Sequence, residues 1–227
     1  MDPAGAKVSG AIAIWVKTPG LSPVKTRLAA GIGGVEAERF HLLAAAAVAA
    51  VVRRVATELP GTLTPYWAVA ESGATLWREL EVVEQGEGGL GERLSRVYDA
   101  LLARHAFVLF LGADSPQLSP PLLADAVART QRGEFVLGPA HDGGFYLFGG
   151  ARSLPRETWT GVPYSDPATL GTLEGSLRSH GPVARLAPLD DVDTVADLAP
   201  LREALARART LLPEQTALSA WLQQLDR

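Results

Sequence analysis

A short stretch near the start of the sequence concentrates positive charge in a chain that is acidic overall. Lys17, Lys25 and Arg27 lie close together, and no acidic residue occurs between positions 3 and 35. The whole chain contains three lysines, so two of them in one stretch is a strong bias. Lysine presents a compact charge with three rotatable donors, which suits a phosphate whose charge changes during a reaction. This stretch is therefore a candidate phosphate site.

The same stretch has the composition of a stiff turn. Gly20 lies between Pro19 and Pro23, and the backbone N–H groups of such a turn can face phosphates. The sequence GLSPVKT lacks the second glycine that precedes the lysine of a P-loop, which excludes that motif. A solvated loop with incidental charge is the alternative. We expect the following residues to bind a nucleotide, with Lys25 also acting in catalysis: Lys17, Thr18, Pro19, Gly20, Lys25 and Arg27.

Two carboxylates come directly after runs that resemble strands. Asp114 follows the apolar run FVLFLGA, and a carboxylate in that position needs a hydrogen bond or a cation. In LDDVD, alternation puts Asp191 and Asp193 on the same side, so either can pair with Asp114. Mg²⁺ takes one or two carboxylates and fills its shell with water and phosphate oxygens. We predict that Asp114 and Asp193 bind Mg²⁺ or Mn²⁺; local capping at Asp114 and a solvated acidic helix start are the alternatives.

A glycine-rich segment, GPAHDGGFYL, carries the candidate acceptor residues. Gly143 and Gly144 permit a close approach to the backbone. Asp142 can accept a hydrogen bond from an acceptor hydroxyl or act as a catalytic base. Tyr164 and Ser165 are candidates for the same acceptor pocket.

A second glycine-rich segment, GGLGERL, resembles the entry to a helix. Gly91 offers a backbone N–H group and Arg93 can reach an anion, so we add both residues to the candidate nucleotide site. A simple helix cap with a solvated face is the alternative.

The composition favours an ordinary globular protein. With 227 residues, 47% of them hydrophobic, the chain can bury a core as one domain. The net charge of -4 argues against broad nucleic-acid binding, and the absence of cysteine excludes disulfides and cysteine chemistry. The longest apolar block, residues 42–52, is too short to span a bilayer. Because the N-terminus lacks the features of a signal peptide, we expect a cytoplasmic protein.

Short β-branched or aromatic runs alternate with stretches of helical periodicity, which is typical of a layered α/β sheet. In such sheets ligands bind beyond the carboxyl ends of the strands, where the candidate residues lie. The strand–glycine–strand pattern around Gly143 indicates an antiparallel element near the site. The expected strands cover residues 11–16, 64–70, 81–85, 107–113, 135–140, 144–149 and 183–189. The expected helices cover residues 35–58, 90–105, 120–132, 167–180, 195–209 and 213–224.

Five segments together resemble one known family. They are VKTPGLSPVKTRLA, LGERL, GADSPQLS, GPAHDGGFYL and DVDTVADL, and they occur in family order over most of the chain. The family is the GT-A-fold nucleotide-diphospho-sugar transferase-like group, specifically the radical-SAM/selenodomain-associated transferases. The first loop also resembles that of 2-phospholactate guanylyltransferases. The late DVDT is similar to an Asn-x-Asn-Thr element of molybdenum-cofactor nucleotidyltransferases, which favours Asp193 over Asp190.

The resemblance implies a single-domain α/β/α Rossmann-like GT-A fold over residues 1–227, with a mixed, mostly parallel sheet. It also implies a nucleotide bound by the first-strand loop and a divalent metal at Asp114. Two departures from the family bear on the acceptor: Tyr164-Ser165-Asp166 replaces Trp-Ser/Gly-Thr, and Phe145 replaces Tyr. The D-x-D motif of many glycosyltransferases is reduced to the one carboxylate of GADSP.

Three functions are compatible with these residues. The leading hypothesis is a metal-dependent glycosyltransferase that uses an NDP-sugar and a small-molecule acceptor. The alternative is a nucleotidylyltransferase that joins an NTP to a phosphorylated acceptor and releases pyrophosphate. The third is a nucleotide-binding protein without catalysis. We expect that the protein neither binds nucleic acid nor spans a membrane.

Overall fold

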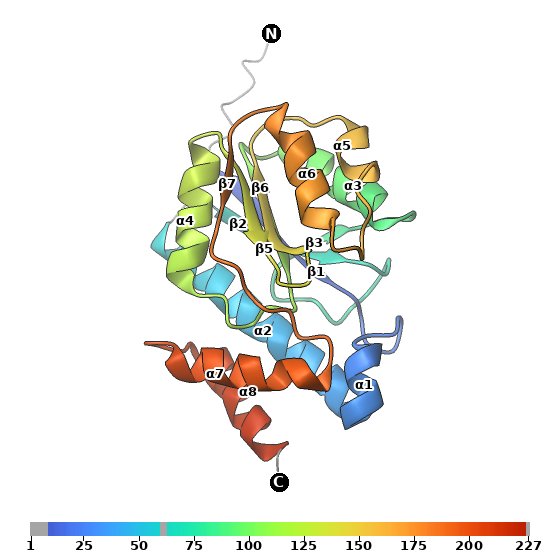
Figure 1. Cartoon of the computed structure of the whole chain (residues 1–227), viewed down its shortest axis with the longest axis vertical. Helices are drawn as coiled ribbons and strands as arrows, with labels where there is room; N and C mark the ends of the chain where they lie inside the picture. Colours follow the sequence, from blue (N-terminus) through green and yellow to red (C-terminus); the bar gives the residue numbers. More distant parts are fainter. Residues whose placement is uncertain (1–8, 60–62, 226–227) are drawn as a thin grey trace.

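The computed structural model describes residues 9–59 and 63–225. Figure 1 shows a central sheet with helices on both of its faces. The strands are β1 (Gly10–Val16), β2 (Leu63–Val69), β3 (Glu81–Glu84), β4 (Val108–Gly112), β5 (Phe135–Pro139), β6 (Phe145–Gly150) and β7 (Val183–Arg185). The helices are α1 (Thr26–Ile32), α2 (Gly34–Glu58), α3 (Leu90–Leu102), α4 (Pro120–Gln131), α5 (Arg156–Thr160), α6 (Thr169–Arg178), α7 (Leu198–Arg207) and α8 (Pro213–Gln224), with a 3-10 turn η1 (Val195–Asp197).

The seven strands are ordered β3-β2-β1-β4-β6-β5-β7, and β6 is the reversed strand. It pairs antiparallel with β4 and β5, whereas β1 pairs parallel with β2 and β4, and β5 pairs parallel with β7. The expected mixed, mostly parallel α/β sheet is therefore confirmed. The turn between β5 and β6 lies at the same edge as the carboxyl ends of β1 and β4, because β6 returns from that edge.

The sheet is covered on both faces, so its central strands are apolar on both sides. In β1, Ile12 and Ile14 face a cluster that includes side chains of α2 and α4. Ala11 and Ala13 face the opposite cluster, which includes side chains of α3, α5 and α6. Because successive side chains of β1 face two different apolar clusters, every position of the run AIAIWV is hydrophobic although the run forms a single strand.

Helix α2 passes a length and composition test for crossing a membrane. Its apolar side chains are nevertheless used inside the protein, since α2 packs against β1, β2, α4 and α8. Much of the helix is alanine and valine, and these small side chains let it lie close to the sheet. The helix is thus accounted for as the core helix of this α/β fold.

A third apolar cluster joins the beginning and the end of the chain. Leu28 of α1 and Phe40 of α2 belong to it together with Val192, Leu198 and Trp221. The indole N–H of Trp221 also donates to Glu36 at 2.7 Å. This packing brings the loop before α1 and the loop before η1 together, although more than 160 residues separate Lys25 from Asp193.

Several element boundaries differ from those expected. The basic stretch is not one loop through residue 28, because α1 begins at Thr26. Helix α5 was not anticipated, and it has only five residues. The expected strand 183–189 ends at Arg185. Regular pairing stops because the carbonyl of Ala187 accepts a hydrogen bond from Tyr146 and Pro188 has no N–H to donate. Beyond this point the segment forms a single bridge, between Ala140 and Leu189. The expected helix 195–209 begins as the 3-10 turn η1.

Candidate active site

Two adjoining cavities open at the carboxyl edge of the sheet. One has a volume of about 590 Å³ and is lined by residues from the ends of β1 and β3 and from the loop before α1. The other, of about 780 Å³, is lined by residues from the ends of β4 and β6 and from the loop before α6. We call them the basic cavity and the acidic cavity after the charges that line them. They share Trp15, Arg27, Leu90, Asp114 and Asp193.

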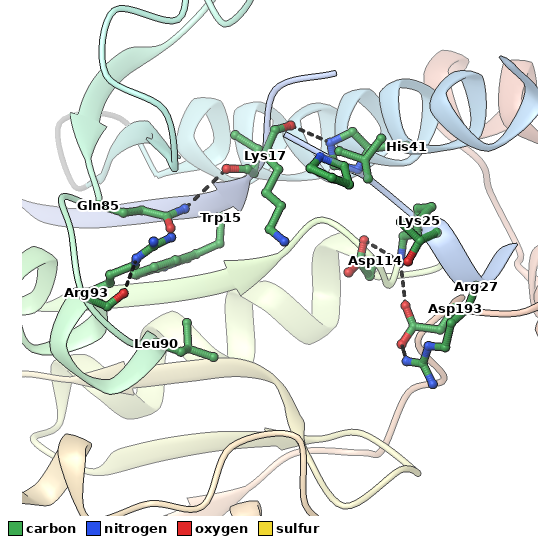
Figure 2. Close-up of a pocket in the computed structure, with 15 residues that line it drawn as sticks. Trp15, Lys17, Lys25, Arg27, His41, Gln85, Leu90, Arg93, Asp114 and Asp193 are labelled. Carbon is green, nitrogen blue, oxygen red and sulfur yellow. Dashed lines mark hydrogen bonds and ion pairs between the residues drawn. The ribbon is translucent and has the colours of Figure 1, made fainter. Parts of the chain in front are cut away.

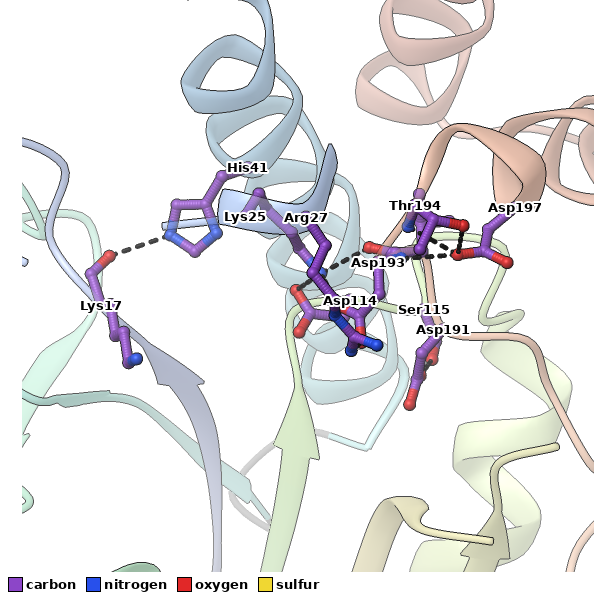
Figure 3. Close-up of polar contacts among 11 residues, drawn as sticks. Lys17, Lys25, Arg27, His41, Asp114, Ser115, Asp191, Asp193, Thr194 and Asp197 are labelled. Carbon is purple, nitrogen blue, oxygen red and sulfur yellow. Dashed lines mark hydrogen bonds and ion pairs between the residues drawn. The ribbon is translucent and has the colours of Figure 1, made fainter. Parts of the chain in front are cut away.

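Lys25 joins the two predicted metal ligands. Its Nζ lies 2.8 Å from Oδ1 of Asp114 and 3.0 Å from Oδ1 of Asp193, and it donates to the carbonyl of Val192 at 2.5 Å. Figure 3 shows the ammonium group between the two carboxylates. The Lys25 side chain is only 5% exposed, whereas those of Asp114 and Asp193 are 42% and 34% exposed, so the ammonium group is shielded from water while the carboxylates face the cavities. One lysine thus holds together the ends of three separate segments.

The charge state of Lys25 follows from these contacts. Burial acts to lower its pKa, but the charges of Asp114 and Asp193 outweigh burial and raise the pKa above its ordinary value. Lys25 is therefore an ammonium ion at neutral pH. Its backbone lies in the left-handed region, with φ of 46°, which is uncommon for a residue with a side chain. This conformation sets Lys25 at the entry to α1 with its side chain directed to the carboxylates.

Asp193 is fixed from two sides. Its Oδ2 accepts a hydrogen bond from Arg27, whose side chain is 69% exposed. Its backbone N–H donates to Asp197 at 3.0 Å, and Asp197 also accepts from the N–H and the hydroxyl of Thr194. Asp197 therefore caps the start of η1, and Asp193 is left as the carboxylate that faces the cavities.

The donor set fits a hard divalent cation. Oxygens of Asp114 and Asp193 converge on one point, now taken by the Lys25 ammonium, and two carboxylates suffice for Mg²⁺ or Mn²⁺ when substrate phosphates and water complete the shell. Among the described residues there is no group of three His, Cys, Asp or Glu side chains able to hold a metal by itself. A metal held between these two carboxylates would therefore take its remaining ligands from water or a substrate.

The other cationic candidates also line the basic cavity. Figure 2 shows Lys17 projecting from the end of β1 into the space between Arg93 on one side and Lys25 on the other. Arg93 is steadied by a 2.9 Å hydrogen bond from its Nε to the carbonyl of Gly88. Lys7, the third lysine of the chain, lies outside the described residues.

Thr18, Pro19 and Gly20 form the turn behind Lys17 and line neither cavity. The hydroxyl of Thr18 accepts from the indole of Trp77 at 3.0 Å, and its N–H donates to Glu71 at 2.8 Å. Gly20 has a φ of +83°, the left-handed region that favours glycine. These residues shape the loop that presents Lys17; their predicted contact with a nucleotide stays a prediction.

Most of the predicted acceptor residues meet in the acidic cavity. Asp142, Gly144, Tyr164 and Ser165 line it. Gly143 does not line it; its φ is +92° and its carbonyl accepts from Leu170, so it shapes the turn between β5 and β6. The structure therefore places Asp142 in the same cavity as Asp114 and Asp193, which also line the basic cavity.

Three residues that line the cavities were not singled out from the sequence. His41 and Gln85 line the basic cavity and Trp15 lines both cavities. Asp191, the other carboxylate considered as a partner of Asp114, lines neither cavity; it accepts a hydrogen bond from the Ser115 hydroxyl, and burial raises its pKa to about 6. A polar residue inside the apolar helix FHLLAAAA was the available signal for His41. The signal for Gln85 was a polar residue at the end of a strand.

His41 couples α2 to the end of β1. Its Nε2 lies 2.9 Å from the carbonyl of Lys17, and burial lowers its pKa below the ordinary value despite that hydrogen bond. A lowered histidine pKa means that the unfolded chain binds more protons, so this contribution to stability is complete above about pH 6.5 and is lost as the pH falls.

We predict that His41→Gln, which keeps an N–H donor for the Lys17 carbonyl, makes stability less dependent on pH. Urea unfolding at about pH 5 and about pH 7.5 should show a smaller loss of unfolding free energy on acidification for His41→Gln than for the unsubstituted protein. Equal losses in the two proteins would contradict the assignment of a neutral, buried His41.

Gly91, predicted to bind nucleotide, lies at the contact between α3 and α5. A Cβ atom added there would be 2.6 Å from the carbonyl oxygen of Trp159. We predict that Gly91→Ala lowers the unfolding free energy by about 1–3 kcal/mol through overpacking. Gly175→Ala is the matched control, since a Cβ there meets no atom within 4 Å and alanine favours the helix. Unchanged stability with weaker nucleotide binding would instead support the nucleotide role.

The fold and the site can be compared with solved structures. The chain is similar to a provisionally assigned nucleotide-diphospho-sugar transferase from Desulfovibrio desulfuricans G20, with a TM-score of 0.79 and 25% identity over 95% of this chain and 96% of that chain. It shares its fold with Rv0371c from Mycobacterium tuberculosis H37Rv, with a TM-score of 0.55 and 18% identity over 87% of this chain and 99% of that chain.

A further structural likeness is to 4-diphosphocytidyl-2C-methyl-D-erythritol synthase from Anaerococcus prevotii DSM 20548. The TM-score is 0.54, with 11% identity over 95% of this chain and 98% of that chain. Together these likenesses confirm the predicted fold class and the resemblance to nucleotide-diphospho-sugar transferase-like proteins. No curated protein sequence matches the chain.

One family model covers more than half of the chain. It matches residues 43–166 and is described as "Uncharacterized protein conserved in bacteria (DUF2064)". The matched region includes Asp114, which lines both cavities, and Asp142 and Tyr164, which line the acidic cavity. The chain therefore belongs to the DUF2064 family.

Proposed function

We propose that the protein is a metal-dependent glycosyltransferase that uses an NDP-sugar as donor and a small molecule as acceptor. The observation that carries this proposal is the pair of adjoining cavities with opposite charge, which share Asp114 and Asp193. A nucleotide diphosphate needs cations, and the basic cavity supplies Lys17, Lys25 and Arg93 in addition to the shared Arg27. The likeness to the Desulfovibrio transferase supports an enzyme that uses a nucleotide-activated donor.

The basic cavity offsets the charge that develops on the leaving nucleotide. Lys17 extends into the cavity from the end of β1, and Arg27 and Lys25 lie beside the shared carboxylates. A divalent cation held by Asp114 and Asp193 would add Lewis-acid stabilisation of the diphosphate. Preorganised charges of this kind commonly contribute several kcal/mol to transition-state stabilisation.

Lys25 has two alternative sets of partners in this proposal. Without a nucleotide, its ammonium group neutralises Asp114 and Asp193. When a diphosphate enters the basic cavity, Lys25 turns towards it and leaves the two carboxylates free to coordinate. Asp142, in the acidic cavity, takes the proton of the acceptor.

The alternative is nucleotidyl transfer, in which the α-phosphate of an NTP is attacked by a phosphorylated acceptor. The shared fold with a 4-diphosphocytidyl-2C-methyl-D-erythritol synthase favours keeping this candidate. It uses the same lysines and carboxylates, but a different bond breaks and pyrophosphate leaves.

We expect tight binding of at least one UDP-sugar or GDP-sugar that depends on Mg²⁺, measured by isothermal titration calorimetry. Asp114→Asn should weaken this binding about tenfold or more, because one of the two coordinating carboxylates is lost. Asp125→Asn is the control, since Asp125 pairs with Arg129 on α4 and lines neither cavity. NTP binding with release of pyrophosphate in the presence of a phosphorylated acceptor would overturn the glycosyltransferase assignment.

We also expect Lys25→Met to have opposite effects on two ligands. Nucleotide diphosphate binding should weaken about tenfold or more, because a buried cation is lost. Binding of Mn²⁺ alone, followed by electron paramagnetic resonance, should become tighter, because the ammonium no longer occupies the space between Asp114 and Asp193. Lys17→Met should weaken only the nucleotide. Weaker Mn²⁺ binding by Lys25→Met would contradict the exchange of partners.

A further inference from the structure

We propose that the acceptor is a polyhydroxylated ring compound, such as a sugar or a cyclic polyol, and that it carries no phosphate or carboxylate group. This inference rests on the proposed function and concerns the acidic cavity, which the donor does not fill. It is drawn from the charges, hydrogen-bonding groups and apolar walls that line that cavity.

The charge of the acidic cavity is unfavourable for an anion. Four carboxylates and one guanidinium group are among the described side chains that line it. The four are Asp114, Asp142, Asp166 and Asp193, and the guanidinium is that of Arg27. Arg27 pairs with Asp193 and serves the nucleotide diphosphate in the proposed function, and it is the one cationic side chain among the described residues that line this cavity. A phosphorylated acceptor would therefore meet the like charges of Asp142 and Asp166 without a cation of its own.

The two carboxylates that belong to this cavity alone are held in place by turns. An oxygen of Asp142 accepts from the N–H of Gly144 at 2.8 Å, and an oxygen of Asp166 accepts from the N–H of Ala168 at 2.8 Å. An ionised carboxylate is an acceptor only, so the ligand must bring donors. Ser165 lies between these turns with a φ of 60°, which is a strained position for a residue with a side chain.

The remaining polar groups suit hydroxyls. The hydroxyl of Ser165 can donate, whereas Asp142 and Asp166 can only accept. A hydroxyl both donates and accepts, so a polyol can satisfy both kinds of group.

The walls of the cavity provide flat apolar surface for a ring. Trp15, Phe145 and Tyr164 line it together with Leu90 and Leu94. Aromatic side chains bind the C–H face of a ring while the polar groups around them bind its hydroxyls. Such a combination of aromatic wall and fixed carboxylates matches a neutral sugar ring better than a phosphorylated chain.

The transfer balances with this acceptor. An acceptor hydroxyl oxygen forms a bond to the anomeric carbon of the donor sugar, and the bond from that carbon to the diphosphate oxygen breaks. The electron pair of the broken bond leaves on the nucleoside diphosphate, towards the basic cavity. The hydroxyl proton goes to the carboxylate of Asp142.

Saturation-transfer NMR with three matched probes tests the inference. The probes are the neutral methyl glucoside, galactoside and mannoside, each compared with its 6-phosphate, in the presence of a nucleoside diphosphate and Mg²⁺. We expect at least one neutral glycoside to bind about tenfold or more tightly than its 6-phosphate. Tighter binding of a 6-phosphate, or no saturation transfer to any neutral glycoside, would overturn the inference.

A charge reversal separates this inference from the proposed function. Asp166→Lys should strengthen binding of the 6-phosphates and weaken binding of the neutral glycosides. Nucleotide binding in the basic cavity should stay unchanged, because Asp166 does not line it. Glu38→Lys adds the same charge on α2 outside both cavities and should change neither glycoside binding nor nucleotide binding. If Asp166→Lys has the same preference between neutral glycosides and 6-phosphates as the unsubstituted protein, the inference is overturned. If the unsubstituted protein binds no NDP-sugar, the proposed function is overturned instead.

Discussion

The buried ammonium of Lys25 is the interaction on which the site depends. It ties the loop before α1 to the end of β4 and to the segment before η1, through Asp114, Asp193 and the carbonyl of Val192. Two carboxylates this close would repel each other without a cation, and a lysine this buried would lose its proton without carboxylates. The carboxylates therefore keep Lys25 protonated, and the ammonium group of Lys25 offsets the repulsion between the carboxylates. The apolar cluster that contains Leu28 and Val192 holds the backbones of these segments in position.

The sheet places chemistry on both sides of this interaction. Parallel strands β1 and β4 deliver Lys17 and Asp114 to one edge, and the reversed strand β6 brings the turn with Asp142 to the same edge. The result is a basic cavity and an acidic cavity with a common boundary. In the proposed function, a donor that carries phosphates and an acceptor that lacks them occupy separate cavities and meet at the shared residues, which include Asp114 and Asp193.

The sequence was sufficient to predict the fold class and the segments of the site, because strand runs, glycine turns and isolated charges are local signals. It placed Asp114 after a strand and anticipated an antiparallel element near Gly143. It did not reveal that Lys25 itself lies between Asp114 and Asp193, since that contact joins residues far apart in the chain. Gly91 illustrates the same limit, because the neighbour that explains a glycine there, Trp159 on α5, belongs to another helix.

The hairpin formed by β5 and β6 contributes to only one of the two cavities. Its turn and the segment before α6 line the acidic cavity, whereas the basic cavity is lined from the ends of β1 and β3 and from α3. Residues such as Phe145 in the hairpin and Ser165 before α6 can therefore be exchanged without altering the strand ends that present Lys17. In the proposed function, this modularity lets acceptor preference be redesigned in these two segments while the donor cavity is left intact.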